Sequence, residues 1–230
     1  DKMQVVGPSG INIERFEKKM KLEQTRRVVT YYSLLTQMRV NGGNDYINLI
    51  NGILSGKCKQ TAHLDNYEFK VINDFKKFND LQQKKEAEFT LSRMIAGYAW
   101  EWKSKKDKSC YDMELDGVKK QWNYKLENWV LSEGADKQVG CIHTIQGFDL
   151  NYGFVIMGDE IGYDHENRAI IVRPECYYDQ NGKKTAPREE LLDYVKHIYY
   201  VLMTRGIKGT YLYICDKELR EYVCSIVGEM

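Results

Sequence analysis

Residues 139–160, VGCIHTIQGFDLNYGFVIMGDE, hold a polar turn between two apolar runs. A plain connection between strands uses Asn-Gly or a run of serine and glycine, whereas this turn carries side chains that can bind a ligand. The members of interest are His143, Thr144, Gln146, Gly147 and Asp149. The apolar runs predict buried strands at 139–145 and 152–158, so the turn is expected to lie at an edge of a sheet.

A second stretch, YYVLMTRGIKGTYLYI at 199–214, contains a cation in a comparable place. The pattern predicts a helix from Pro187 to about Thr204, then Arg205, then a buried strand at 209–216. An arginine between a helix and a core strand lies at the rim of an α/β sheet, where ligands bind. The structural alternative is that Arg205 pairs with the last carbonyl groups of its own helix.

The elements that position these residues follow from apolar spacing and from turn residues. Helices are expected at 11–30, from Asn44 to about Leu54 with a stop at Gly56, at about 74–87 after a cap at Asn73, and from Lys217 onward. Strands are expected at 67–72, 92–100 and 168–174, and 31–40 is expected to be a short strand end. A loop is expected at 103–110 and a hairpin at 111–124 around Asp116-Gly117. Because strands and helices alternate and several strands are apolar throughout, the fold class is α/β, a mostly parallel sheet with helices on both faces and a β-hairpin insertion.

Composition restricts the class of partner. With a net charge of +1, no bulk field draws the protein to nucleic acid or membrane, so a nucleic-acid contact must come from a local patch. The six cysteines lack C-x-x-C spacing, which argues against a zinc site, and no other metal site is predicted on this chain beyond the hairpin alternative below. No signal peptide or long apolar span is present, so the predicted location is the cytoplasm, without a membrane partner.

Three carboxylates alternate in the predicted hairpin and therefore share one strand face: Asp112, Glu114 and Asp116. Such a face could bind a divalent metal and cleave nucleic acid. The alternative is a solvent-facing sheet edge.

Residues 141–149, CIHTIQGFD, and 200–206, YVLMTRG, resemble motifs V and VI of superfamily 1 (UvrD/Rep-like) helicases, approximately T-x-H-x-x-K/Q-G-x-E and Y-V-A-x-T-R-A. Upstream, DKMQ at 1–4 resembles the tail of motif III, and TQMR at 36–39 resembles motif IV. A closer resemblance is to a bacterial group of helicase-like P-loop ATPases, through QMRVNGGNDYIN at 37–48 and SRMIAGYAWEW at 92–102.

The resemblance implies a RecA-like fold and a division of the chain. Residues 1–10 would be the tail of a first RecA-like domain, and 11–230 a second domain with insertions around 103–130 and 160–186. No G-x-x-x-x-G-K-[ST] occurs, and GILSGKC at 52–58 is one residue short and lacks the magnesium-binding hydroxyl. ATP and Mg²⁺ are therefore expected only in the full-length protein, between this domain and an N-terminal RecA-like partner, and not on this fragment alone.

The resemblance also implies roles. Arg205 would be the arginine finger and Arg39 a second phosphate clamp, since guanidinium groups stabilise a transferring phosphoryl group. Gln4 would sense the γ-phosphate and Asp149 would accept a hydrogen bond from the ribose. The nucleotide site would also include Gly147, and coupling to single-stranded DNA would use His143, Thr144 and Gln146.

Each role has a structural alternative. Arg39 would be a surface salt-bridge partner, His143 a core histidine and Asp149 a turn cap. The sequence also departs from the helicase pattern at Cys141, Asp149 and Gly206, where threonine, glutamate and alanine are usual. The alternative function is a nucleotide-dependent switch or interaction module that does not unwind.

Overall fold

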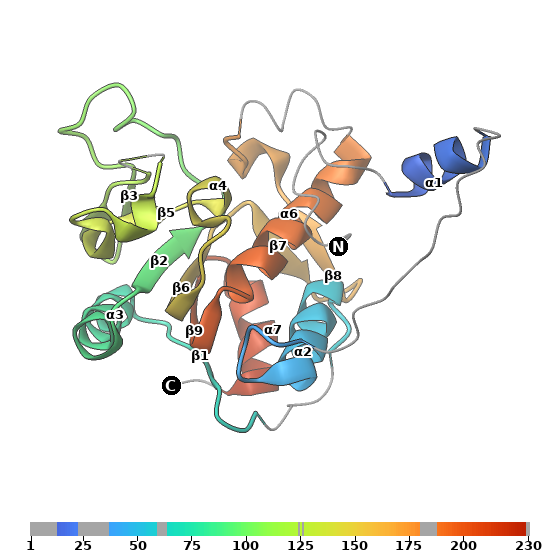
Figure 1. The fold of residues 1–230 in the computed structure, drawn as a ribbon, viewed down its shortest axis with the longest axis horizontal. Helices are drawn as coiled ribbons and strands as arrows, with labels where there is room; N and C mark the ends of the chain where they lie inside the picture. Colours follow the sequence, from blue (N-terminus) through green and yellow to red (C-terminus); the bar gives the residue numbers. More distant parts are fainter. Residues whose placement is uncertain are drawn as a thin grey trace.

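The computed structural model describes residues 13–22, 37–58, 64–123, 125, 127–179 and 188–228. At its centre is a five-stranded sheet with the order β1-β9-β6-β2-β5, in which every neighbouring pair is parallel (Figure 1). The strands are β1 (Glu68–Val71), β2 (Ser92–Ala96), β5 (Val139–Gly140), β6 (Leu150–Met157) and β9 (Gly206–Ile214). The predicted α/β class is confirmed, and the arrangement is consistent with a RecA-like domain.

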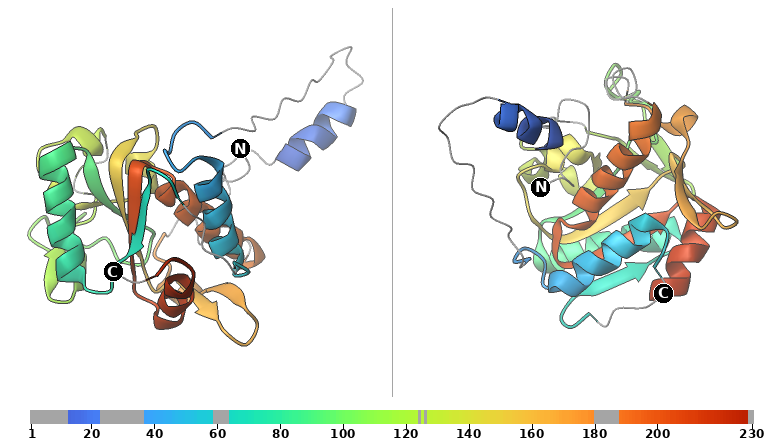
Figure 2. Two further views of the ribbon diagram at one scale, coloured as in Figure 1. Left: turned by 90° about the horizontal axis from the view of Figure 1, so that it is seen from below. Right: turned by 90° about the vertical axis from the view of Figure 1, so that its right-hand side faces the viewer.

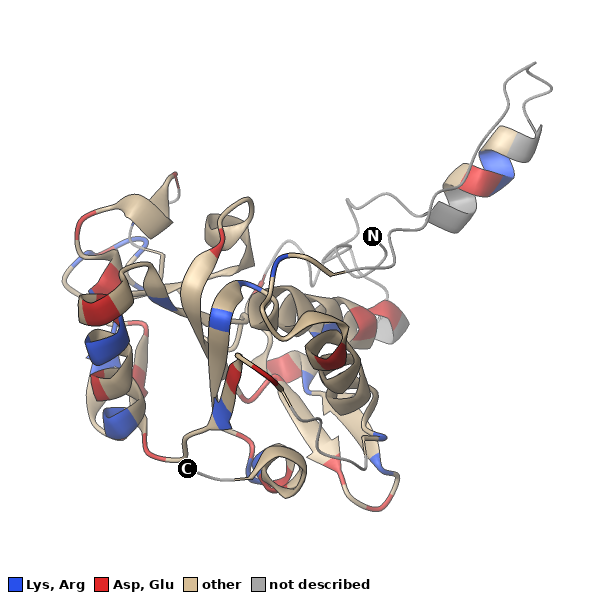
Figure 3. Ribbon diagram, turned by 60° about the horizontal axis from the view of Figure 1, so that its bottom comes forward, with Lys and Arg blue, Asp and Glu red and all other residues tan. Residues whose placement is uncertain are grey.

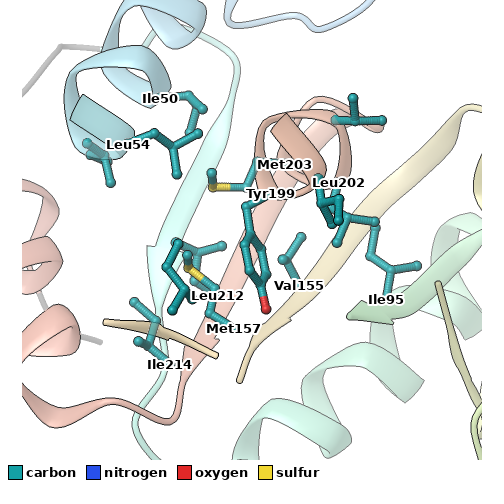
Figure 4. Close-up of a cluster of buried hydrophobic side chains, with 14 of the residues drawn as sticks. Ile50, Leu54, Ile95, Val155, Met157, Tyr199, Leu202, Met203, Leu212 and Ile214 are labelled. Atoms are coloured by element: carbon teal, nitrogen blue, oxygen red, sulfur yellow. The ribbon is translucent and has the colours of Figure 1, made fainter. Parts of the chain in front are cut away.

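Helices cover both faces of this sheet (Figure 2). One face carries α2 (Gly43–Ser55), α6 (Arg188–Met203) and α7 (Lys217–Val227), and the other carries α3 (Phe75–Phe89). Because successive side chains of a strand point to opposite faces, Phe154 of β6 packs toward α3 whereas Val155 packs beneath α6 (Figure 4). Burial on both faces explains why the central strand β6 is apolar along most of its length.

Two small antiparallel sheets lie within the ranges where insertions were predicted. The first pairs β3 (Met113–Leu115) with β4 (Val118–Lys120) around Asp116 and Gly117, whose φ angles of 48° and 78° confirm the predicted hairpin turn. The second pairs β7 (Ile161–Asp164) with β8 (Ala169–Val172), and the strand β7 was not predicted from the sequence.

Helix boundaries follow local capping, with some differences from expectation. Gly56, at φ 74°, ends α2 as predicted, but Gly42 precedes the helix and Asn44 lies inside it. The side chain of Asp74, rather than Asn73, accepts from the Lys77 N–H and begins α3.

The observed strands end earlier than the strands predicted from the apolar runs. The chain leaves β2 after Ala96, so the strand expected at 92–100 is too long. Residues 37–40 are not in a strand and bend at 39–40, whereas 31–36, the rest of the expected strand end, lie outside the described residues. The remaining described helices are α1 (Ile13–Leu22), α4 (Ile142–Ile145) and the 3₁₀ turns η2 (Trp129–Leu131), η3 (Ala135–Lys137) and η4 (Pro174–Cys176).

Acidic and basic residues mix on the outer face of α3 (Figure 3). Exposed Lys76 and Lys77 alternate along this helix with exposed Asp80 and Glu88, so no single-sign field covers it. Among the described helices, none combines the length and the apolar character that crossing a membrane requires.

Candidate functional site

The segment after β5 is a helix, so the strand predicted at 139–145 is wrong beyond its first two residues. The hydroxyl of Thr144 accepts from the Cys141 N–H at 2.9 Å and lies 3.0 Å from the Asn123 side-chain oxygen, to which it donates. That oxygen also accepts from the Cys141 N–H, at 2.9 Å. Both bonds satisfy the N–H of Cys141, the residue that precedes α4, so the buried Thr144 side chain helps to hold the start of this helix in place.

His143 lies on the outer side of α4 and is exposed, which excludes the core-histidine alternative. Its ring centre is 6.1 Å from that of Tyr98, which follows β2. The Tyr98 hydroxyl donates to the buried thiol of Cys141 at 3.6 Å. The thiol at the usual threonine position therefore points into the protein.

The turn after α4 is open to solvent. Gln146 and Gly147 are exposed, and Gly147 has φ 89°, a conformation that favours glycine. No described atom lies within 4 Å of where a Cβ on Gly147 would be, so the turn is not packed against the body of the protein.

Asp149 ends this turn and forms an ion pair with Arg39. The Arg39 Nε and the Asp149 Oδ1 are 2.8 Å apart, and the side chains are 35% and 47% exposed. The Arg39 backbone is held by the Gln37 side chain, and the nearby Asn41 N–H donates to the Ile207 carbonyl at 2.9 Å, which ties this segment to the start of β9.

Arg205 lies between α6 and β9 and is only 5% exposed. Its Nη1 donates to the Phe148 carbonyl at 3.4 Å, not to a carbonyl of α6 as the structural alternative required. Its own carbonyl accepts from the Leu150 N–H at 2.9 Å. Its Nε is buried and finds no acceptor among the described residues.

The three charged groups act on one another. Burial lowers the pKa of Arg205, the charge of Arg39 lowers it further, and the charge of Asp149 opposes both. The same Arg39 charge reaches Tyr200 on α6, where it opposes the rise in pKa that burial causes. Arg39, Asp149 and Arg205, which are far apart in the sequence, therefore meet at the amino ends of β6 and β9.

Residues 141–149 run from the carboxyl ends of the parallel strands to their amino ends. Because β5 and β6 both run parallel to β2, the chain must return from the carboxyl end of β5 to the amino end of β6. His143 and Tyr98 lie near the carboxyl ends of β5 and β2. Asp149 and the two arginines lie at the amino ends of β6 and β9. One short segment thus contacts both places.

Asn123 and Tyr98 help to position this segment and were not predicted from the sequence. Their partners are more than ten positions away along the chain, so no local pattern indicates them. Gln4 lies outside the described residues.

The hairpin carboxylates do not gather. Asp112 is buried and accepts from the Ser104 backbone and hydroxyl and from the Trp122 N–H. Asp116 accepts from the Phe75 N–H at the start of α3, while exposed Glu114 faces Lys119. In the part of the chain that the structure describes, no group of three or more His, Cys, Asp or Glu residues could hold a metal ion, so the nuclease alternative loses its basis.

Comparison with known proteins gives the relationship. The family model described as "Schlafen group 3, DNA/RNA helicase domain" matches residues 1–216. The uncharacterized protein YPL245W of Saccharomyces cerevisiae is 34% identical over 215 residues, covering 83% of this chain and 47% of the relative, so the chain spans about half of that protein's length. No solved structure matches. The chain therefore belongs to the family of Schlafen group 3 DNA/RNA helicase domains.

Proposed function

We propose that this chain is the C-terminal RecA-like half of a helicase-like ATPase, which supplies Arg205 and Arg39 to an ATP bound mainly by another domain. The observation that carries the proposal is the meeting of Arg39, Asp149 and Arg205 at the amino ends of β6 and β9. Motif-like segments from three parts of the sequence contribute one residue each. Membership of a helicase-domain family supports the same conclusion.

The chemistry needs positive charge where a phosphoryl group transfers. Arginine stays charged and forms planar hydrogen bonds to phosphate oxygens, and such an arginine can accelerate transfer by about 10³–10⁵-fold. Phosphate-binding and Mg²⁺-binding groups would come from an N-terminal RecA-like domain. Closure of the two domains would bring Arg205 and Arg39 onto the γ-phosphate, and Asp149 would accept from the ribose hydroxyl.

Coupling to a single strand of nucleic acid would use the segment 141–149. Exposed His143 and Gln146 lie on its outer side, whereas buried Thr144 holds α4 in place. Because the same segment ends at Asp149, a shift of the strand-binding end would be transmitted to the arginine pair. The half-buried Trp102, whose ring lies 5.1 Å from the Lys105 Nζ, is an additional surface for base stacking.

The test is steady-state ATPase activity of the full-length protein with and without single-stranded DNA. We expect Arg205→Ala to reduce turnover at least about tenfold with little change in nucleotide affinity. Arg205→Lys keeps a positive charge at this buried position but lacks the planar guanidinium group. It therefore separates the loss of that group from a loss of folding. Arg168→Ala, at an exposed position in the β7–β8 turn, is the control. An unchanged rate in both Arg205 variants would refute the assignment.

The second candidate function is a nucleotide-dependent switch that does not unwind. Arg205 is buried and Arg39 is already paired, so nucleotide binding requires a rearrangement, which is what a switch needs. ATPase activity that depends on Arg205 but is not changed by any nucleic acid would favour the switch.

A cytoplasmic location is part of the proposal, and the six free cysteines support a reducing compartment.

A further inference from the structure

Arg39 and Arg205, here called the arginine pair, both lie within reach of the charge of one carboxylate, that of Asp149. Arg39 contacts Asp149 at 2.8 Å, and Arg205 experiences the charges of both. Two guanidinium groups and one carboxylate leave an excess of positive charge at this place. The charge of Arg39 disfavours the charged form of Arg205, and Asp149 offsets this effect, so the carboxylate stabilises an arrangement of two like charges.

Arg205 has a donor that the described protein does not satisfy. Arg205 is only 5% exposed, and its Nε is buried and lacks an acceptor among the described residues. An unpaired buried donor on a charged group is costly, and such groups are normally satisfied by an ion, a water or a ligand. A phosphate oxygen is the kind of acceptor that a guanidinium binds best.

We propose that Asp149 is a resident counter-ion of this pair, which holds Arg39 while the site is empty and releases it to a phosphate group of the nucleotide. The inference rests on the proposed function and adds the regulation of the same site. Asp149 contacts the Arg39 Nε, a donor that a phosphate oxygen could also use. Once displaced, its carboxylate is free to accept from the ribose hydroxyl, so one residue serves two successive states.

The exposure of the pair makes this exchange feasible. Both side chains are partly open to solvent, at 35% and 47%, and a pair of this kind is weak because water and salt screen it. A fully buried pair would resist separation, since each charge would lose a partner in a low dielectric. A triphosphate carries several negative charges and therefore competes well with one carboxylate.

The test measures binding of inorganic tripolyphosphate to the full-length protein by calorimetry. This anion has phosphates but no ribose, so the change in its affinity caused by Asp149→Asn reports the exchange at the arginine pair without a contribution from the ribose contact. We expect Asp149→Asn to bind it about three- to tenfold more tightly than the unmodified protein does. The control is Glu114→Gln, which removes the same charge from the separate β3–β4 hairpin and should leave the affinity unchanged.

ATP is the second probe. Asp149→Asn should gain less affinity for ATP than for tripolyphosphate, because the variant also loses the acceptor for the ribose. Equal or weaker binding of tripolyphosphate by Asp149→Asn would overturn the counter-ion role while leaving the arginine assignment in place. If neither protein binds tripolyphosphate, the arginine pair is not an anion site and the proposed function falls together with the inference.

Discussion

The hydroxyl of Tyr199 on α6 donates a 2.6 Å hydrogen bond to the carboxyl group of Glu160, which follows β6. Both residues are fully buried, and Figure 4 shows the Tyr199 ring directed from α6 toward the sheet. The second carboxyl oxygen of Glu160 has no partner in the described part of the chain. Burial raises the pKa of Glu160 from 4.5 to about 7, so near neutral pH the folded protein holds a proton that the unfolded chain releases.

Glu160→Gln should therefore flatten the dependence of stability on pH. In the unmodified protein the contribution of Glu160 is complete below pH 4.5 and is lost as pH rises through about 7. The loss amounts to about 3 kcal/mol at most. Urea denaturation at pH 5 and pH 8 measures it, with Glu114→Gln at an exposed position of the β3–β4 hairpin as the control. Parallel curves for Glu160→Gln and the unmodified protein would show that the buried carboxyl does not titrate in this range.

Thr144→Val should destabilise the protein because it removes the hydroxyl that caps α4 and leaves the shape almost unchanged. We expect a loss of about 1–2 kcal/mol in the free energy of unfolding. Thr144→Ser keeps the hydroxyl and should lose less. If Thr144 instead contacts nucleic acid directly, Thr144→Val will weaken binding of a single-stranded oligonucleotide without changing the urea midpoint.

Gly147→Ala tests the place of the exposed turn in the nucleotide site. A side chain at φ 89° costs about 1–2 kcal/mol although the methyl group itself would enter open space, so the strain would shift the turn that leads to Asp149. We expect the KM for ATP to rise while kcat is nearly unchanged. Gly134→Ala is a matched control, because Gly134 also has a positive φ, 79°, and lies near η3. An equal KM in the two variants would remove Gly147 from the site.

Asp112→Asn distinguishes a structural carboxylate from a metal ligand. Asp112 accepts three hydrogen bonds inside the protein, so placing an amide there should cost about 2–4 kcal/mol of stability. Exposed Glu114→Gln in the same hairpin should change stability little. Thermal denaturation with and without Mg²⁺ or Mn²⁺ measures both effects. Stabilisation of the unmodified protein by either metal, lost in Asp112→Asn, would restore the nuclease alternative.

The sheet and most helices could be predicted from the sequence because burial imposes a period that the chain displays. The runs around Phe154 and Leu212 are apolar throughout, as strands covered on both faces must be. The helix α4 was missed because the residues 139–142 continue the apolar run of a strand. The Cys141 N–H, at the start of α4, donates to the side chains of Thr144 and Asn123, and Asn123 lies 18 positions away in the sequence.

The sequence indicated which residues to consider for the candidate site, but not the contacts that they make. The arginines and Asp149 can be found from motif-like spacing, because each follows or precedes a core element. The burial of Arg205 and the pairing of Arg39 with Asp149 depend on how α6, β9 and the segment at 37–42 pack together. Long-range packing of this kind leaves no local signal in the sequence.

The two outer strands of the sheet are short, and this has a consequence for handling the protein. At one side β1 has four residues, including the charged Lys70, and at the other β5 has two. The free side of β5 is covered by the chain at 121–123, which exchanges backbone hydrogen bonds with Val139. An incoming chain therefore finds few unpaired peptide groups on which to add a strand, so the concentrated domain should resist fibrillar aggregation.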